Sequence, residues 1–229
     1  DTVAAIIQYL IWKNKVEKGE KTNLHYTFKD FTNSKFGGNT LSNWEIKKFA
    51  DKLKDIVCLL IGCTRKQLED RDFKETSLGV EWRVFKHTLD NSILSPQEMS
   101  IQHALHNGFR DCFYEEINLT PRLLLQKIGT DLFRNQLHPN TWVNSTFANY
   151  LNDAWIITDV RFPNELQAIK DRNGIVIRVN RNNSLFKSVI HESETALDNY
   201  EFDYIIDNNG TIEELIVKIK DILIERGVL

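Results

Sequence analysis

The sequence predicts an α/β fold, with a parallel β-sheet between helices, and three observations support that class. Apolar runs of strand length alternate with helical segments along the second half of the chain, as in parallel strands joined by crossover helices. The apolar run 155–160 breaks at Pro163 and leads into a helix, which indicates a buried strand, a turn and a helix start. A later strand, 202–207, leads through Asn208-Asn209-Gly210 into a helix with Thr211 and Glu214 placed as a capping box.

The other elements are expected in the following order. The first half of the chain predicts a helix at 2–13, a polar excursion at 13–43, a strand at 44–50, and a helix that Asp51 caps and that runs through Leu60 to end near Gly62. Residues 64–118 give no clear pattern beyond a helix near 98–115. The remaining predictions are a helix that begins at Thr120-Pro121, a helix at 141–151, a helix at 164–172, a turn at Asn173-Gly174 and a strand at 175–180.

Composition narrows the class of protein. The 229 residues are enough for one α/β domain with insertions and a substantial core. Lys and Arg number 29 against 32 Asp and Glu, a net charge of −3, which argues against a broad basic surface for duplex nucleic acid. Neither a span of about 20 apolar residues nor a signal peptide is visible. The three cysteines suggest no disulfide framework and favour a cytoplasmic setting.

Asp159 and Arg161 follow the predicted strand 155–160. Open α/β sheets bind ligands beyond the carboxyl ends of their strands, so this pair is placed for chemistry. A structural bridge between strand and loop is the alternative. The chain also begins in a helix without a strand before it. Asp1-Thr2-Val3-Ala4 is what we expect directly after the glycine-lysine pair of a phosphate-binding loop, although Asp1 as an ordinary helix cap fits the same residues.

Five segments occur together in one order. They are Asp1-Thr2-Val3-Ala4, Lys48-Phe49-Ala50-Asp51-Lys52-Leu53-Lys54, Thr120-Pro121-Arg122 with Gln126 and Gly129-Thr130-Asp131, Asp159-Val160-Arg161-Phe162-Pro163-Asn164-Glu165, and Asp207-Asn208-Asn209-Gly210-Thr211. In this order the chain resembles the phage-type deoxynucleoside monophosphate kinases of the P-loop kinase superfamily. Each segment alone is a weak signal, whereas five in order are specific.

The resemblance implies a three-layer α/β/α P-loop kinase fold with a parallel sheet and a mobile lid. Residues 1–229 would form one domain, with an insertion at 13–43 and a helical acceptor and lid region at about 84–151. The implied activity is transfer of the ATP γ-phosphoryl group to a deoxynucleoside 5′-monophosphate, with ATP and Mg²⁺ required. Small-molecule substrates are then the expected partners, without duplex nucleic acid or membrane. A homodimer is compatible, as is the host cytoplasm if the gene is from a phage.

The donor side is implied as follows. The family's loop runs Gly-x-x-x-x-Gly-Lys-Asp-Thr, so Asp1 and Thr2 match its last two positions. We expect the glycines, the lysine and the preceding strand upstream in a longer gene product. Asp1 suits Mg²⁺ and Thr2 suits a phosphate contact, with helix capping as the alternative for Thr2. Asn208 and Gly210 lie where related kinases wrap adenine, but they are equally a turn before a helix.

The resemblance places the acceptor nucleotide against ten residues: Asp51, Lys54, Arg122, Gln126, Gly129, Thr130, Trp142, Asp159, Arg161 and Glu165. Arg122, Asp159 and Arg161 are the catalytic candidates. Arg161 would stabilise the transferring phosphate, Asp159 the metal or the acceptor, and Glu165 a sugar or base group. For Asp51 and Lys54, a helix cap and a solvated lysine remain the alternative.

Arg122, Gln126, Gly129 and Thr130 share one face at α-helical spacing. Arg122 can grip a phosphate through two parallel hydrogen bonds, and Gln126 can bind a base edge. Gly129 costs about 1 kcal/mol in mid-helix relative to alanine, so it needs a reason: either a ligand or another helix approaches closely. Trp142 could stack on the base or fill the core.

Arg134, Arg178 and Arg181 are further candidates for neutralising phosphate, with Arg178 and Arg181 before a polar loop at 182–193 that could form part of the lid. Solvated salt bridges are their alternative. The pair His103 and His106 with Asp111 and Cys112 matches no structural zinc spacing. Three other functions stay open: a non-catalytic nucleotide-binding protein of the same fold, a structural subunit that docks through 13–43, and another small-molecule P-loop kinase such as one acting on dephospho-coenzyme A.

Overall fold

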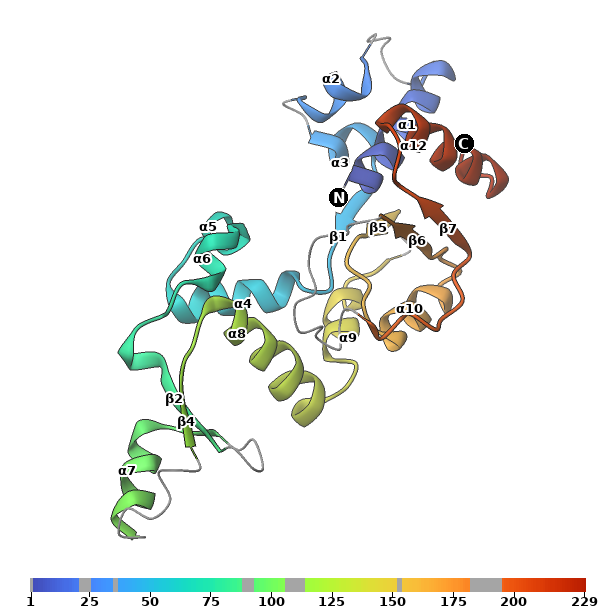
Figure 1. Ribbon diagram of the computed structural model, residues 1–229. Helices are drawn as coiled ribbons and strands as arrows, with labels where there is room; N and C mark the ends of the chain where they lie inside the picture. Colours follow the sequence, from blue (N-terminus) through green and yellow to red (C-terminus); the bar gives the residue numbers. More distant parts are fainter. Residues whose placement is uncertain are drawn as a thin grey trace. The chain divides into compact units, whose positions relative to one another are not determined.

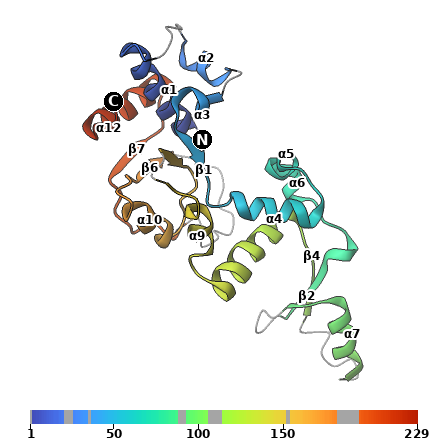
Figure 2. The same ribbon diagram turned by 180° about the vertical axis from the view of Figure 1, so that it is seen from behind.

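The computed structural model describes residues 2–20, 26–34, 37–87, 93–105, 114–151, 154–181 and 195–229. The chain divides into two compact units (Figures 1 and 2). Unit 1 comprises Asp1–Phe49 and Val143–Leu229, and unit 2 comprises Ala50–Trp142. Predictions for Asp1, for His106, Asp111 and Cys112, and for the whole of the proposed lid loop at 182–193 lie outside the described residues.

Unit 1 is a mixed α/β structure in which parallel strands and helices alternate. Its elements are α1 (Thr2–Glu17), α2 (Phe28–Thr32), α3 (Gly37–Ser42), β1 (Glu45–Lys47), β5 (Trp155–Ile157), α10 (Pro163–Lys170), β6 (Ile177–Asn180), β7 (Tyr204–Asp207) and α12 (Ile212–Glu225). Helix α9 (Thr141–Phe147) begins at the end of unit 2 and continues into unit 1. The helices and strands predicted in the two segments of unit 1 are confirmed, with ends that differ by a few residues.

The strands of unit 1 pair in parallel, as predicted, but they form two sheets. Strand β1 pairs with β5, with Ile46 opposite Ile156, and β6 pairs with β7, with Val179 opposite Ile206. Within the described residues these two pairs share no ladder of hydrogen bonds. Parallel pairing is therefore confirmed for this part of the chain, whereas a single continuous sheet stays a prediction. Strands of both pairs line a cavity described below.

The core of unit 1 is built on α1 and α12. Helix α1 is apolar on nearly every side over residues 4–12, so it is buried almost completely. Ile6 and Ile219 are both fully buried in this core. Phe31 of α2 joins the same cluster with an exposure of only 2%. Residues 26–34 and 37–43 thus contribute to the core, which corrects the expectation of a polar excursion.

Unit 2 is mainly helical and carries one small antiparallel sheet. Its elements are α4 (Asp51–Ile61), α5 (Arg65–Glu69), α6 (Arg71–Glu75), the 3₁₀ turn η1 (Val80–Trp82), β2 (Arg83–His87), β3 (Ile93–Leu94), α7 (Pro96–Leu105), β4 (Tyr114–Asn118), α8 (Pro121–Gln126) and the π-helix η3 (Lys127–Leu137). The sheet has the order β3-β2-β4. It was not predicted, because charged residues such as Arg83 and Glu116, which pair across it, obscure the strand pattern.

Of two helix starts predicted in unit 2 from capping residues, one is confirmed and one is displaced by a residue. Thr120 caps α8 by accepting a hydrogen bond from the Leu123 amide at 3.2 Å, with Pro121 in the first turn, as predicted. In contrast, Ala50 is the N-cap of α4, so Asp51 is its first helical residue and not its cap. Gly62 ends α4 in the left-handed conformation with φ 69°. Val57, Leu68, Leu124 and Ile128 form the buried core that α4, α5, α8 and η3 share.

Candidate functional site

Asp159 lies just past the carboxyl end of β5, where the sequence placed it for chemistry. Its Oδ1 atom accepts a hydrogen bond of 2.8 Å from the backbone N–H of Phe49. Phe49 follows β1, the parallel partner of β5, so the carboxylate joins the ends of two strands that are 110 residues apart. Phe49 itself is 2% exposed. This contact corresponds to the structural bridge raised as an alternative from the sequence.

Arg161 and Glu165 belong to the turn that follows. Glu165 is 3% exposed, and its Oε2 atom accepts hydrogen bonds from the N–H groups of Arg161 at 2.8 Å and Phe162 at 3.1 Å. A carboxylate in the first turn of a helix, here α10, also interacts favourably with the helix dipole. Glu165 therefore fixes the backbone at Arg161, whose side chain is exposed.

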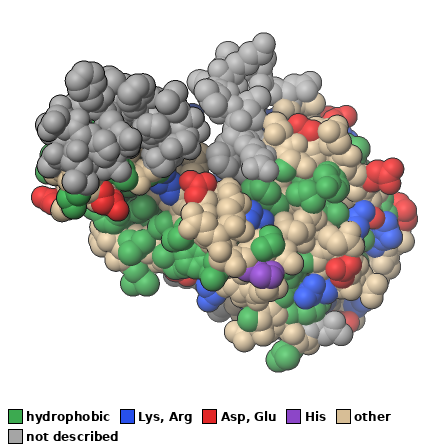
Figure 3. Space-filling model, turned by 90° about the horizontal axis from the view of Figure 1, so that it is seen from below, with side chains coloured by type: hydrophobic (Ala, Val, Ile, Leu, Met, Phe, Trp, Pro, Cys, Tyr) green, Lys and Arg blue, Asp and Glu red, His purple; other side chains and the backbone are tan. Residues whose placement is uncertain are grey.

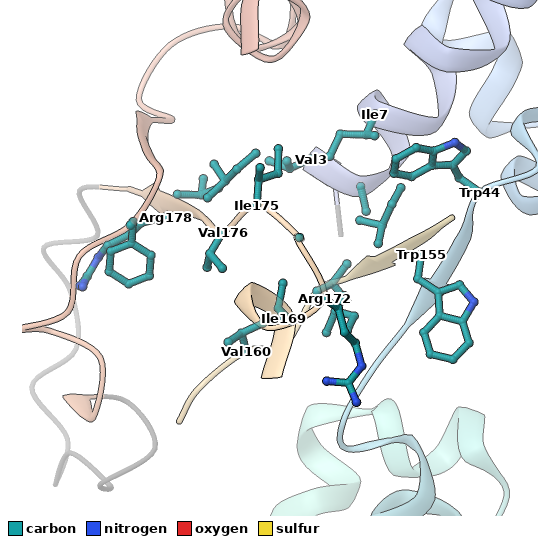
Figure 4. Close-up of a pocket in the computed structure, with 18 of the residues that line it drawn as sticks. Val3, Ile7, Trp44, Trp155, Val160, Ile169, Arg172, Ile175, Val176 and Arg178 are labelled. Atoms are coloured by element: carbon teal, nitrogen blue, oxygen red, sulfur yellow. The ribbon is translucent and has the colours of Figure 1, made fainter. Parts of the chain in front are cut away.

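A cavity of about 950 Å³ opens in unit 1 next to this turn. Its lining includes three predicted site residues: Thr2 of α1, Arg161 after β5 and Asn208 after β7. Apolar side chains, including Val3, Ile7, Ile175 and Val176, surround the space, and Arg172 and Arg178 lie at its margin (Figure 4). Thr158 also lines it, and the Thr158 Oγ1 atom is buried without a hydrogen-bond partner among the described residues.

The turn between β7 and α12 contains Asn208 and Gly210. The backbone N–H of Asn208 donates to the backbone carbonyl of Asn180 at 2.8 Å and so extends the pairing of β6 with β7. A Cβ atom at Gly210 would lie 1.9 Å from Oε2 of Glu214, so a larger residue would displace that carboxylate. Thr211 caps α12 by accepting from the Glu214 amide at 3.2 Å, which confirms one half of the predicted capping box.

In unit 2, the two candidates on the first turn of α4 are engaged in ion pairs. Lys54 contacts Glu69 of α5 at 2.6 Å, and Asp51 contacts Arg65 at 2.8 Å. Burial acts to raise the pKa of Glu69, but the hydrogen bond from Lys54 and the nearby cations outweigh it and hold that pKa below the usual 4.5. Burial acts to lower the pKa of Arg65, but hydrogen bonds to Asp51 and Asp55 outweigh it and raise that pKa.

Arg122, on the first turn of α8, is also paired. Its Nε atom donates to Oε1 of Glu75 on α6, and the two side chains are 45% and 55% exposed. Gln126 ends α8, and Thr130 lies in η3, both half-buried. The face predicted from α-helical spacing thus crosses into a π-helix after Gln126. A π-helix has hydrogen bonds from residue i to i+5, so α-helical spacing does not describe residues 127–137, and the face that Arg122 shares with Thr130 stays a prediction.

Gly129 and Trp142 pack inside unit 2. A Cβ atom on Gly129 would lie 2.7 Å from Cδ2 of Leu53 on α4, so a glycine allows the two helices to approach. Trp142 is 5% exposed, its Nε1–H donates to the Gly129 carbonyl at 2.8 Å, and its ring lies 5.2 Å from that of Phe133. Of the alternatives raised from the sequence, the structure supports helix packing for Gly129 and core filling for Trp142.

The additional arginines have distinct positions. Arg178, in β6, contacts Asp198 at 2.7 Å, donates to the Leu197 carbonyl and lies over the ring of Phe202. Arg181 is exposed just past β6, and Arg134 lies in η3. Arg178 thus corresponds to the salt-bridge alternative. The acidic partners Glu69, Glu75 and Asp198 were missed from the sequence, because they are far from their arginine or lysine in the chain.

The structure therefore brings the candidates together in two sets. Asp159, Arg161 and Glu165 share one turn of unit 1, and Thr2 and Asn208 share a cavity with Arg161. Asp51, Lys54, Arg122, Gln126 and Thr130 lie on helices of unit 2. Among the residues that the structure describes, no group of three or more His, Cys, Asp or Glu side chains could hold a metal ion.

On the face drawn in Figure 3, Lys and Arg side chains are scattered among acidic and apolar ones. None of the helices in the described part of the chain is long and apolar enough to cross a membrane.

Comparison with known proteins adds independent evidence. A family model described as deoxynucleotide monophosphate kinase matches residues 1–219. The chain is 33% identical over 110 residues to a putative deoxynucleotide monophosphate kinase of Acanthamoeba polyphaga mimivirus, covering 42% of this chain and 56% of the relative. It is 33% identical over 108 residues to the deoxynucleotide monophosphate kinase of Enterobacteria phage T4, covering 44% of each chain.

A third relative, the deoxynucleoside-5′-monophosphate kinase of Escherichia phage T5, is 32% identical over 148 residues, covering 55% of this chain and 58% of the relative. The matched part of the chain spans about half the length of these curated relatives. The family match covers nearly the whole chain and agrees with the segments that carry the resemblance. The chain belongs to the deoxynucleotide monophosphate kinase family.

Proposed function

We propose that this protein transfers the γ-phosphoryl group of ATP to a deoxynucleoside 5′-monophosphate, giving the diphosphate and ADP. One observation carries the proposal beyond family membership. The exposed Arg161 side chain extends from a backbone that the buried Glu165 fixes, beside a cavity that Thr2 and Asn208 also line. This reaction requires anionic substrates held in position and their charge neutralised. A cation on a fixed backbone at a strand end suits that task.

The ATP side of the proposal uses the cavity. Its lining is mixed, with many apolar side chains. Strands β5 and β6, which belong to separate parallel pairs, both contribute to it. We propose that a strand preceding Asp1 fills this space and joins the pairs into one P-loop kinase sheet, with its loop feeding α1 at Thr2. The unpaired Thr158 Oγ1 would then gain a partner. Backbone N–H groups at the α1 start would bind ATP phosphates, and the Asn208–Gly210 turn would meet adenine.

Magnesium belongs to the donor side of the same proposal. Mg²⁺ in such sites is held by one or two carboxylates together with substrate phosphates, so it does not need a cage of protein ligands. The absence of a three-ligand group in the described residues is compatible with this arrangement. We assign Asp1 as the carboxylate that would hold Mg²⁺ with the ATP phosphates. The ion would neutralise phosphate charge during transfer.

The acceptor side is assigned to unit 2. Arg122 and Lys54 are the cations for the dNMP phosphate, and Asp51, Gln126 and Thr130 supply polar contacts. Glu75 accepts a hydrogen bond from Nε of Arg122. The two terminal nitrogens of a guanidinium form a second edge that suits two phosphate oxygens, so the ion pair orients Arg122 without consuming this edge. Gly129 and Trp142 support the site through packing.

The chemistry then follows. An oxygen of the dNMP phosphate attacks the γ-phosphorus of ATP, and the bond to the bridging oxygen breaks so that ADP leaves. Negative charge spreads over the transferring group, and Arg161 is assigned to stabilise it. The relatives from phages support a role in deoxynucleotide supply in the host cytoplasm.

A coupled ADP-release assay on the protein expressed from its complete reading frame tests the function. With ATP and Mg²⁺, we expect turnover with at least one of dGMP, dTMP, dCMP and dAMP. Dephospho-coenzyme A serves as the competing acceptor. Turnover with dephospho-coenzyme A alone, or binding of dNMP without turnover, would contradict the proposal.

A further inference from the structure

We infer that Asp159 is a positioning residue, which holds the amide of Phe49 and thereby fixes the point where the chain leaves unit 1 for helix α4. The inference rests on the proposed function and specifies how Asp159 serves it. The sequence left Asp159 as a ligand of metal or acceptor. The structure instead gives its carboxylate a defined backbone partner 110 residues away.

The first argument is the position of the bond in the sheet. Backbone pairing of β1 with β5 extends to the contact of the Thr158 amide with the Lys47 carbonyl, at 3.3 Å. The Phe49 amide lies two residues further on. There the Asp159 carboxylate, and not another backbone group, accepts its hydrogen at 2.8 Å. The carboxylate thus prolongs the connection between the strand ends beyond the ladder.

The second argument is what Phe49 leads to. Its ring is buried at 2% exposure and meets Phe147 edge-on at 5.9 Å, so both its side chain and its amide are held. Asp51 begins α4 only two residues later, and Lys54 follows within the first turn. These two residues are assigned to the acceptor nucleotide. Phe49 is therefore held two residues before the first residue assigned to the acceptor nucleotide.

The chain offers a matched control for a purely structural carboxylate. Asp203 precedes β7, and its Oδ2 atom accepts from the Val176 amide at 2.7 Å, just before β6. This is the same kind of bond between neighbouring parallel strands. It lies at their amino ends, whereas Asp159 acts at the carboxyl ends. Removing Asp203 should affect the fold without reaching the acceptor residues.

The test compares Asp159→Asn, Asp159→Ala and Asp203→Ala with the wild type. Calorimetry measures dNMP affinity with and without Mg²⁺, and hydrogen exchange measures protection of the Phe49 amide. The asparagine oxygen can still accept the hydrogen bond, so Asp159→Asn should keep protection and lose no more than about threefold in affinity. Asp159→Ala should lose protection and at least about tenfold in affinity, equally with and without Mg²⁺. Asp203→Ala should keep both.

Three results would overturn the inference. If Asp159→Asn were as damaging as Asp159→Ala and the loss appeared only with Mg²⁺, the carboxylate would be a metal ligand. If Asp159→Ala bound dNMP like the wild type, the bond to Phe49 would have no positioning role. A wild-type protein that binds no dNMP would refute the proposed function and the positioning role with it. Protection of the Phe49 amide from hydrogen exchange distinguishes this last case from a failure of the hydrogen bond, because it tests the bond to Asp159 without any nucleotide.

Discussion

The two units hold their positive groups in different ways. In unit 1 the backbone at Arg161 is fixed by Glu165, a carboxylate that is 3% exposed, while the arginine side chain is exposed. In unit 2 the side chains of Lys54 and Arg122 are themselves paired with Glu69 and Glu75, which are 50% and 55% exposed. Unit 1 thus fixes the backbone that carries the cationic side chain. Unit 2 holds the cationic side chains themselves through exposed carboxylates.

This difference has energetic consequences. A buried carboxylate that loses its backbone donors is left with unsatisfied acceptor atoms. Disturbing the backbone that Glu165 holds at Arg161 would therefore cost free energy. Exposed ion pairs contribute only about 0–1 kcal/mol, so they can exchange partners easily. We therefore interpret the turn at Arg161 as rigid. In unit 2, Lys54 can exchange its carboxylate for phosphate, and Arg122 can bind phosphate through the edge that Glu75 does not occupy. The predictions below test this contrast, from the largest expected effect to the smallest.

Arg161→Ala should lower kcat/KM by at least about 100-fold, because contacts to transferring phosphate supply several kcal/mol. Arg122→Ala should act mainly on the KM for dNMP, by about tenfold, because Arg122 is assigned to the ground-state phosphate. Steady-state kinetics on the complete protein measures both. Lys220→Ala, on the exposed surface of α12, is the control and should stay within about twofold. Near-normal turnover in a folded Arg161→Ala protein would remove Arg161 from the mechanism.

The cores of the two units should respond alike to truncation. Leu68 in unit 2 and Ile219 in unit 1 are both fully buried. Leu68→Ala and Ile219→Ala should each lower the free energy of unfolding by about 2–5 kcal/mol, since each leaves a cavity. Urea unfolding measures this, with Lys220→Ala again as the surface control. A loss below about 1 kcal/mol for either would argue against its place in a packed core.

Gly129→Ala tests whether Gly129 serves helix packing. Its new methyl group would lie 2.7 Å from Cδ2 of Leu53, so the unfolding free energy should fall by about 1–3 kcal/mol. In a Leu53→Ala background the same change should cost less, because the obstructing group is gone. Thermal or urea unfolding of the four proteins measures the coupling. A loss of dNMP affinity without loss of stability would instead indicate that a ligand approaches Gly129.

The smallest expected effect concerns Glu69. Its pKa is below the usual 4.5, so its contribution to stability is present above that pH and is lost as pH falls through the lowered value. Because the Glu69 side chain is 50% exposed, Glu69→Gln should cost only about 0.5–1 kcal/mol at pH 7. The difference from wild type should shrink at a pH well below 4.5, where Glu69 becomes protonated in the folded protein. An equal difference in unfolding free energy at both pH values would contradict the assignment.

Local signals in the sequence explain which parts of the fold could be predicted. The Thr120-Pro121 start of α8, the left-handed Gly62 after α4 and the Thr211 cap of α12 depend on a few neighbouring residues, and all three are observed. The parallel strands were also predicted correctly. The antiparallel sheet of β2, β3 and β4 was not, because its register depends on pairing between distant residues such as Arg83 and Asn118. Likewise, Phe31 joins the core only through tertiary packing.

The candidate site shows the same limit. The sequence placed Asp159 and Arg161 at a strand end, and the structure agrees. It left the Gly129 and Trp142 alternatives open, since the packing of Gly129 depends on Leu53, which is far from it in sequence. The shift to a π-helix after Gln126 could not be predicted from the spacing that placed Thr130. Ion-pair partners such as Glu75 are similarly set by contacts between helices α6 and α8.

Product identification by phosphorus NMR tests the central claim most directly. The protein expressed from its complete reading frame is incubated with ATP, Mg²⁺ and one dNMP. The account predicts that the β-phosphate signal of the dNDP appears in step with ADP. ADP that forms without dNDP would reveal ATP hydrolysis, and it would contradict phosphoryl transfer to a deoxynucleotide.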